Sequence, residues 1–216
     1  MNVQTYLPKY RELDLRQYTA RDLLQLRGDL FGAFCQRETH NGGIDPSHSL
    51  SIPKGQENVR VLFARTVEEL LEARDSTERD HFLEELIDAI NFGTAIVFLN
   101  HGSGVLLDQL ADELQGLLEM KHYPVPVPAS GPIDLRVFDI RIIRILQAFS
   151  PLLEKLRNRA WQNGAQHPYF LGSRQIQIAI RALWAEVMAC FDSPEDFIRM
   201  YLAKADVLKF RLETKY

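Results

Sequence analysis

The chain has 216 residues, of which 46% are hydrophobic and 25% are charged, and its formal net charge is −4 at pH 7. This length allows one large domain with a substantial core, or one domain with an insertion. The negative charge argues against a nucleic-acid-binding protein, because such proteins neutralise phosphates with a basic surface. The apolar stretches are too short to span a bilayer and the first residues lack an apolar signal region, so we expect a cytoplasmic protein that is not bound to a membrane.

Apolar residues recur at helical spacing through most of the chain, which predicts an all-α fold. Thr19 is expected to cap the first helix with Asp22 at the third position, and Ser193-Pro194-Glu195-Asp196 is typical of the start of the last one. The helices are expected over about 20–37, 58–74, 82–97, 105–118, 135–159, 174–191 and 194–212.

Three segments between these helices are expected to be non-helical. Residues 38–56 and 164–172 contain glycine and read as loops. Residues 123–132 contain three prolines at alternate positions, which forbid a helix and favour an extended connector. A partner-docking motif is the alternative for this last segment.

Two acidic pairs are the most informative feature of the chain. Glu69 and Glu72 lie in one expected helix, and Glu85 and Asp88 lie in the next. The i,i+3 spacing places each pair on one helix face, so that two packed helices would bring four carboxylates together. Like charges gather only with a counter-charge, and Mg²⁺ prefers carboxylates, waters and substrate phosphates as ligands. The pairs therefore predict a magnesium-dependent nucleotide site.

The alternative for these residues is an ordinary solvated helix face. Thr66 and Glu69 also fit a capping box, although a helix over 58–74 would place Glu69 in its interior. Glu85 and Asp88 border an apolar stripe, so they are expected near the edge of the core. His81, one turn before Glu85, reads as an exposed helix residue, and a position beside the metal ligands is its alternative.

Three segments resemble the all-α NTP pyrophosphohydrolases. The segments VEELLEA and FLEELIDAINF are similar to the first and second acidic motifs of that superfamily. The final segment MYLAKADVLKFRLETKY resembles the YxxKNxxNxxRxxxGY ending of the dimeric dUTPase branch, which includes phage dCTPase/dUTPase members. Its Lys204, Arg211 and Tyr216 fall on the Lys, Arg and Tyr of that ending.

The resemblance implies a helical bundle of the NTP pyrophosphohydrolase type over residues 1–216, with an inserted or enlarged, mobile helical subdomain over 101–192. It implies a homodimer that uses Mg²⁺ to hydrolyse dUTP, or a related pyrimidine deoxynucleoside triphosphate, to the monophosphate and pyrophosphate. The implied metal ligands are Glu69, Glu72, Glu85 and Asp88, with Glu72 as the base that activates water. The implied substrate-binding residues are Gln25, Asn91, Lys204, Arg211 and Tyr216.

The chain departs from the family ending at three positions. Ala205 and Leu208 replace two asparagines that help to hold the nucleotide, and Lys215 replaces a glycine. Two alternatives therefore stay open: the same scaffold with a different base preference, and a nucleotide-binding or interaction protein without turnover. For Lys204 and Arg211 the alternative is a solvated helix end whose cations complement the helix dipole.

Overall fold

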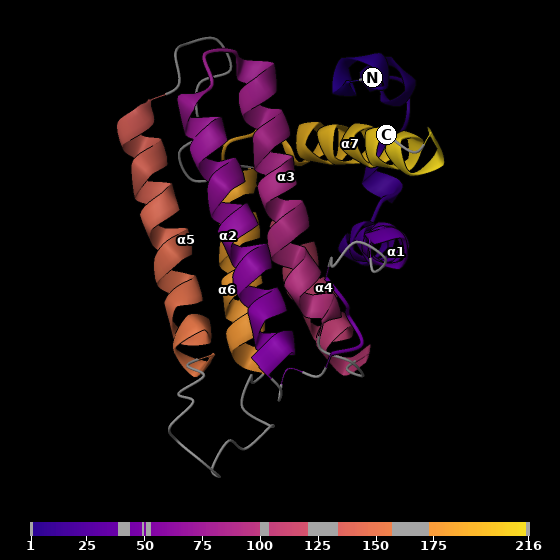
Figure 1. Ribbon diagram of the computed structural model, residues 1–216. Helices are drawn as coiled ribbons and strands as arrows, with labels where there is room; N and C mark the ends of the chain where they lie inside the picture. Colours follow the sequence, from indigo (N-terminus) through magenta and orange to yellow (C-terminus); the bar gives the residue numbers. More distant parts are fainter. Residues whose placement is uncertain are drawn as a thin grey trace.

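The computed structural model describes residues 2–38, 44–48, 50, 53–99, 104–120, 134–156 and 173–214. In these residues all regular structure is helical, which confirms the predicted all-α class (Figure 1). Short 3₁₀ helices at Val3–Thr5, Leu7–Tyr10 and Leu15–Gln17 precede the α-helices. The α-helices are α1 (Ala20–Glu38), α2 (Pro53–Asp75), α3 (Arg79–Phe98), α4 (Gly104–Leu118), α5 (Leu135–Lys155), α6 (Ser173–Met188) and α7 (Pro194–Thr214).

Two predicted helix starts are confirmed by their hydrogen bonds. The Asp22 backbone N–H donates to Thr19 Oγ1, and the Thr19 backbone N–H donates back to Asp22 Oδ2 at 2.7 Å. The Asp196 backbone N–H likewise donates to Ser193 Oγ at the start of α7. Both arrangements satisfy backbone donors that the first turn of a helix leaves without a partner.

Some helix boundaries differ from the predicted ones. The α2 helix begins at Pro53, five residues earlier than predicted, because proline fits the first position of a helix. Asn58 Nδ2 stabilises this additional turn by donating to the Asp45 carbonyl at 3.0 Å. The α5 helix ends at Lys155 rather than at residue 159, and α6 ends at Met188. The predicted non-helical segments 123–132 and 164–172 lie outside the described residues.

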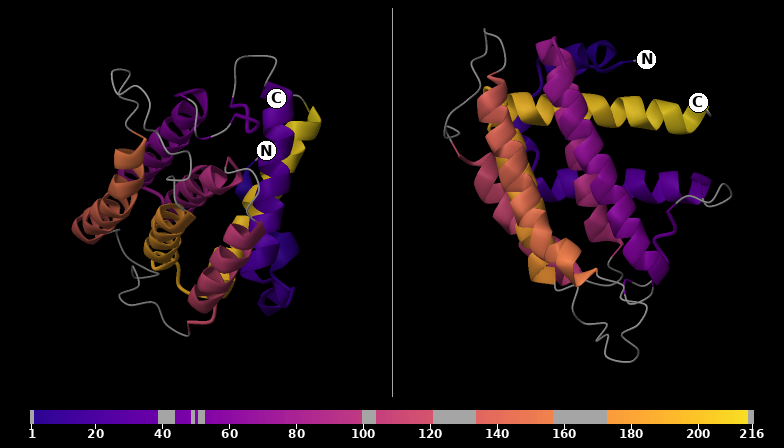
Figure 2. Two further views of the ribbon diagram at one scale, coloured as in Figure 1. Left: turned by 90° about the horizontal axis from the view of Figure 1, so that it is seen from below. Right: turned by 60° about the vertical axis from the view of Figure 1, so that its left-hand side comes forward.

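Four helices lie side by side, and two others cross them. The α2, α3, α5 and α6 helices run along one common direction, whereas α1 and α7 run across it (Figures 1 and 2). The α3 helix packs against α2 along its length and also contacts α1, α6 and α7. Among the described helices, none combines the length and the apolar character that crossing a bilayer requires. The residues carried by α3 are therefore those best placed to meet residues from several other helices.

An aromatic cluster fixes α7 against this layer. The Trp184 ring lies 5.4 Å from the Phe197 ring and 5.9 Å from the Tyr201 ring, measured between centroids. Trp184 Nε1 donates to Thr94 Oγ1 of α3 at 2.9 Å, which satisfies the indole where it is fully buried. Because Tyr201 is held in this cluster, the next turn of α7, which carries Lys204, is directed toward α3.

Close packing of α3 on α6 depends on Gly93. A Cβ atom at this position would lie 2.3 Å from Leu183 Cδ2, and Leu183 is itself fully buried. We expect Gly93→Ala to lower the free energy of unfolding by about 1–3 kcal/mol, because the packed core has no room for the extra methyl. The control is Gly32→Ala in α1, where an added Cβ meets nothing within 4 Å. This control is expected to be neutral or stabilising by up to about 1 kcal/mol. Urea unfolding measures both changes, and equal midpoints for the two variants would contradict the packing argument.

Candidate metal site and adjoining pocket

Three of the four predicted metal ligands lie together between α2 and α3. Glu69 and Glu72 of α2 and Glu85 of α3 each offer a carboxylate oxygen, and these oxygens lie within 4.8 Å of one another. We call these three residues the acidic cluster. Glu85 is only 8% exposed, as expected from its place beside an apolar stripe, whereas Glu72 is exposed to solvent. The i,i+3 spacing on α2 and the packing of α3 against α2 together produce this convergence.

The electrostatics of the acidic cluster favour a cation. The pKa of Glu69 is raised to about 8, first by burial, then by a hydrogen bond with Glu85 and by repulsion from Asp88, Glu85 and Glu72. At neutral pH Glu69 therefore keeps its proton when no cation is present. A hard divalent cation fits a donor set made of carboxylate oxygens, and it would replace this proton as the counter-charge.

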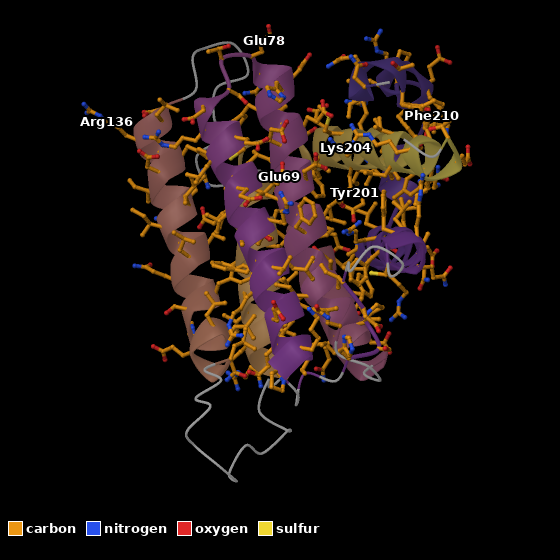
Figure 3. All side chains as sticks on the ribbon, in the orientation of Figure 1. Glu69, Glu78, Arg136, Tyr201, Lys204 and Phe210 are labelled. Carbon is orange, nitrogen blue, oxygen red and sulfur yellow. The ribbon has the colours of Figure 1, made fainter. Side chains whose placement is uncertain are left out.

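Asp88, the fourth predicted ligand, has a different partner. Its Oδ2 atom lies 2.5 Å from Lys204 Nζ, and the same ammonium lies 2.7 Å from Glu84 Oε1. Burial raises the pKa of Asp88, and Lys204 counteracts part of this effect. Asp88 is still close enough to the acidic cluster to raise the pKa of Glu69. Asp88 of α3 therefore binds Lys204 of α7 and also acts on Glu69 of α2. Figure 3 shows Glu69 and Lys204 on the two helices that flank α3.

Two further residues lie near this site: Glu84, which received no site role from the sequence, and His81, for which such a role was only the alternative. Glu84 binds Lys204, and the signal for it was its i,i+4 spacing from Asp88 on the same helix face. His81 has a 55% exposed side chain, as expected, yet its Nδ1 atom lies 3.0 Å from Glu85 Oε1. His81 is thus both an exposed helix residue and a neighbour of the acidic cluster.

A cavity of about 260 Å³ adjoins Asp88 between α1, α3 and α7. We call it the aromatic pocket, because three phenylalanines supply much of its wall. Its polar residues are two arginines, one aspartate and one asparagine. The lining residues are Arg27, Phe31, Phe34, Cys35, Ile44, Leu62, Asp88, Asn91, Phe92, Leu208 and Arg211. Aromatic rings beside cations and an amide are suited to binding a flat heterocycle that carries a phosphate.

The predicted substrate-binding residues do not all lie in one place. Asn91 and Arg211 line the aromatic pocket. Gln25 lies in a separate hollow with Arg21 and Phe98, and its Nε2 atom donates to Asp29 Oδ1 at 2.8 Å. Lys204 binds Glu84 and Asp88, and Tyr216 lies outside the described residues.

Arg27 of α1 lines the aromatic pocket, whereas Gln25 of the same helix does not. The Arg27 Nε atom donates to the Asn91 carbonyl at 2.8 Å, and its guanidinium lies 5.7 Å from the centre of the Phe31 ring. The sequence signal for Arg27 was its place in the apolar stripe of α1, four residues from both Leu23 and Phe31. A charged residue within such a stripe is buried when a partner satisfies it.

A larger hollow, of about 700 Å³, lies between α4 and α6. It is lined by Gln109, Glu113, Arg174, Gln177, Ile178, Arg181, Ala182 and Ala185. None of the residues predicted from the sequence to bind metal or substrate is among them. The aromatic pocket is therefore the better candidate for substrate binding, because it contains Asp88 and adjoins the acidic cluster.

No family model, curated protein or solved structure matches the chain. The resemblance to the dUTPase branch, and the homodimer that it implies, thus stay predictions.

Proposed function

We propose that the protein hydrolyses a deoxynucleoside triphosphate, dUTP or a related pyrimidine nucleotide, to the monophosphate and pyrophosphate with Mg²⁺. The observation that carries the proposal is the convergence of Glu69, Glu72 and Glu85 beside a pocket with aromatic and arginine walls. Mg²⁺, when bound, would neutralise charge on the phosphates and polarise the bond to be broken. The metal preference and the pyrimidine base come from the family resemblance.

The residues of the site can be assigned different tasks. Glu69 and Glu85 are the more buried carboxylates, which suits a role in holding the cation. Glu72 is exposed and is therefore in contact with water, so it is the carboxylate best placed to accept a proton from an attacking water. Arg211 lines the aromatic pocket and can bind phosphate oxygens through two N–H groups.

The base preference depends on the inner wall of the aromatic pocket. Leu208 lines it at one of the positions where the family ending has an asparagine. An apolar side chain offers no hydrogen bond to a base or a sugar, so recognition would fall to Asn91 and to stacking on the phenylalanine rings. Because Leu208 replaces an asparagine in this wall, nucleotides with several different bases should be tested as substrates, and not only dUTP.

Pyrophosphate release from a panel of deoxy- and ribonucleoside triphosphates, with and without Mg²⁺, tests the proposal directly. We expect release from at least one pyrimidine deoxynucleotide, and none when EDTA removes the metal. A folded protein that releases nothing from any nucleotide would contradict the enzymatic proposal.

Nucleotide binding without turnover is the second candidate. The observation that favours it is the ion pair of Asp88 with Lys204, because this pair occupies one of the four carboxylates that the enzymatic site was predicted to use. Calorimetric titration with a non-hydrolysable deoxynucleotide distinguishes the two candidates. Binding without product release in the panel would identify a binding protein.

Arg211→Ala is expected to impair the reaction more than Lys209→Ala. Arg211 lines the aromatic pocket, whereas Lys209 is an exposed residue on the same helix that is absent from the pocket lining. Losing a charge-assisted contact to phosphate should raise KM about tenfold, with a smaller fall in kcat. Steady-state kinetics of the two variants measure this difference. Equal and small effects would show that α7 ends only in a solvated, basic turn.

A further inference from the structure

We propose that the Lys204 ammonium takes the place of a second metal ion at this site, so that each chain binds one divalent cation rather than two. The inference rests on the proposed function, because the cation in question is the one held by Glu69, Glu72 and Glu85. Hydrolytic metal sites often use two ions about 4 Å apart, so the number of ions decides how this site can work.

Three neighbouring acidic residues of α3, Glu84, Glu85 and Asp88, face two different helices. Glu85 faces α2 and joins the acidic cluster. Glu84 and Asp88, one turn apart, face α7 and both bind Lys204, at 2.7 and 2.5 Å. The acidic residues of this region are therefore divided into a set of three that is open to a cation and a set of two that already has one.

Lys204 is fixed in this position. Its side chain is only 3% exposed, and the neighbouring turn of α7 is anchored by the buried Tyr201, whose hydroxyl donates to the Leu23 carbonyl at 3.2 Å. Burial acts to lower the pKa of Lys204, but its contacts with Asp88 and Glu84 outweigh burial and raise it. The ammonium is therefore charged at neutral pH and is held between its partners.

A second metal ion would have to remove Lys204 from Asp88. The displaced ammonium would then be left with Glu84 in a position almost closed to water, and an uncompensated buried charge is strongly unfavourable. Arg27 also acts on Asp88 through its charge. Both cations reduce the negative potential that a second divalent ion would need.

Calorimetric titration with Mn²⁺ alone tests the inference, because Mn²⁺ prefers the same oxygen ligands as Mg²⁺. We expect one Mn²⁺ per wild-type chain and two per Lys204→Met chain, in which Asp88 and Glu84 become free to bind. Lys209→Met, an exposed lysine on the same helix, is the matched control and should bind one. The electron paramagnetic resonance spectrum should report isolated Mn²⁺ in the wild type and a spin-coupled pair in Lys204→Met.

A folding control keeps the test decisive. Lys204→Arg retains the positive charge and should bind one Mn²⁺, so it answers the question if Lys204→Met fails to fold. Two Mn²⁺ per wild-type chain, or two per folded Lys204→Arg chain, would overturn the inference and leave the proposed function intact. One Mn²⁺ in both the wild type and a folded Lys204→Met would also overturn it. If the wild type bound no Mn²⁺, both this inference and the proposed function would be overturned.

Discussion

Glu85→Ala is expected to abolish nucleotide hydrolysis while leaving the helical fold intact. Glu85 is the α3 member of the acidic cluster, so without it the cluster keeps only the two carboxylates of α2. Losing a ligand of the proposed cation should lower kcat by at least about 10²–10³-fold, since the cation would supply most of the charge stabilisation in the proposed reaction. The apoprotein should lose little stability, because the Glu85 carboxylate repels that of Glu69 as well as forming a hydrogen bond with it.

The matched control for this variant is Glu68→Ala. Glu68 is next to Glu69 in sequence, but its side chain is 53% exposed and pairs with Arg65 at 2.8 Å. An exposed ion pair contributes little, so Glu68→Ala should keep the activity and the stability of the wild type. Pyrophosphate release with Mg²⁺ and the far-ultraviolet circular dichroism spectrum measure both variants. Wild-type activity in Glu85→Ala would show that the acidic cluster is not the metal site.

Asp88→Ala should behave differently from Glu85→Ala, although the two residues form one predicted pair. Removing Asp88 leaves Lys204 with Glu84 alone in a buried position. This loss should destabilise the fold by about 1–3 kcal/mol. A loss of activity in Asp88→Ala is thus informative only when its unfolding curve is measured alongside.

The helices and the convergence of three carboxylates could be predicted from the sequence, because both follow from local periodicity. The pairs Glu69 with Glu72 and Glu85 with Asp88 needed only the assumption that α2 and α3 are neighbours. Short breaks between helices make such neighbours antiparallel and adjacent.

The separation of Asp88 from Glu85 could not be predicted in this way. It depends on the crossing of α7 over α3, which is set by a contact between residues far apart in the chain. Lys204 and Arg211 are seven residues apart and so share a helix face, but spacing does not say that Lys204 is buried and Arg211 exposed. The anchoring of Tyr201 against Trp184 decides that difference.

The place of Arg27 in the aromatic pocket could not be predicted for a related reason. The family resemblance drew attention to Gln25 on α1, and no role was assigned to Arg27 from the sequence. Arg27 reaches the aromatic pocket because the Asn91 carbonyl of α3 accepts its Nε hydrogen. This partner belongs to another helix and has no signature in the α1 sequence.

Without a divalent cation, the protein is expected to lose stability as the pH rises toward the pKa of Glu69, about 8. The folded state holds this proton more tightly than the unfolded state, in which the pKa of Glu69 returns to its ordinary value near 4.5. The stabilising contribution is therefore complete below about pH 4.5, declines as the pH rises, and is lost above about pH 8. Because Glu69 is only partly buried, we expect a loss of about 1–2 kcal/mol between about pH 6 and about pH 9.

Urea unfolding in EDTA at these two pH values, with Glu69→Gln as the reference, isolates the contribution of Glu69. Glutamine keeps the size and hydrogen-bonding capacity of the protonated acid but does not titrate, so Glu69→Gln should lose less stability than the wild type over this range. Adding Mg²⁺ should reverse the trend for the wild type, since a cation binds the deprotonated carboxylate and its affinity rises with pH. Mg²⁺ should leave Glu69→Gln almost unchanged. If the stability of the two proteins changed with pH in parallel, Glu69 would be an ordinary carboxylate. If Mg²⁺ did not change the stability of the wild type at high pH, the acidic cluster would not be a metal site.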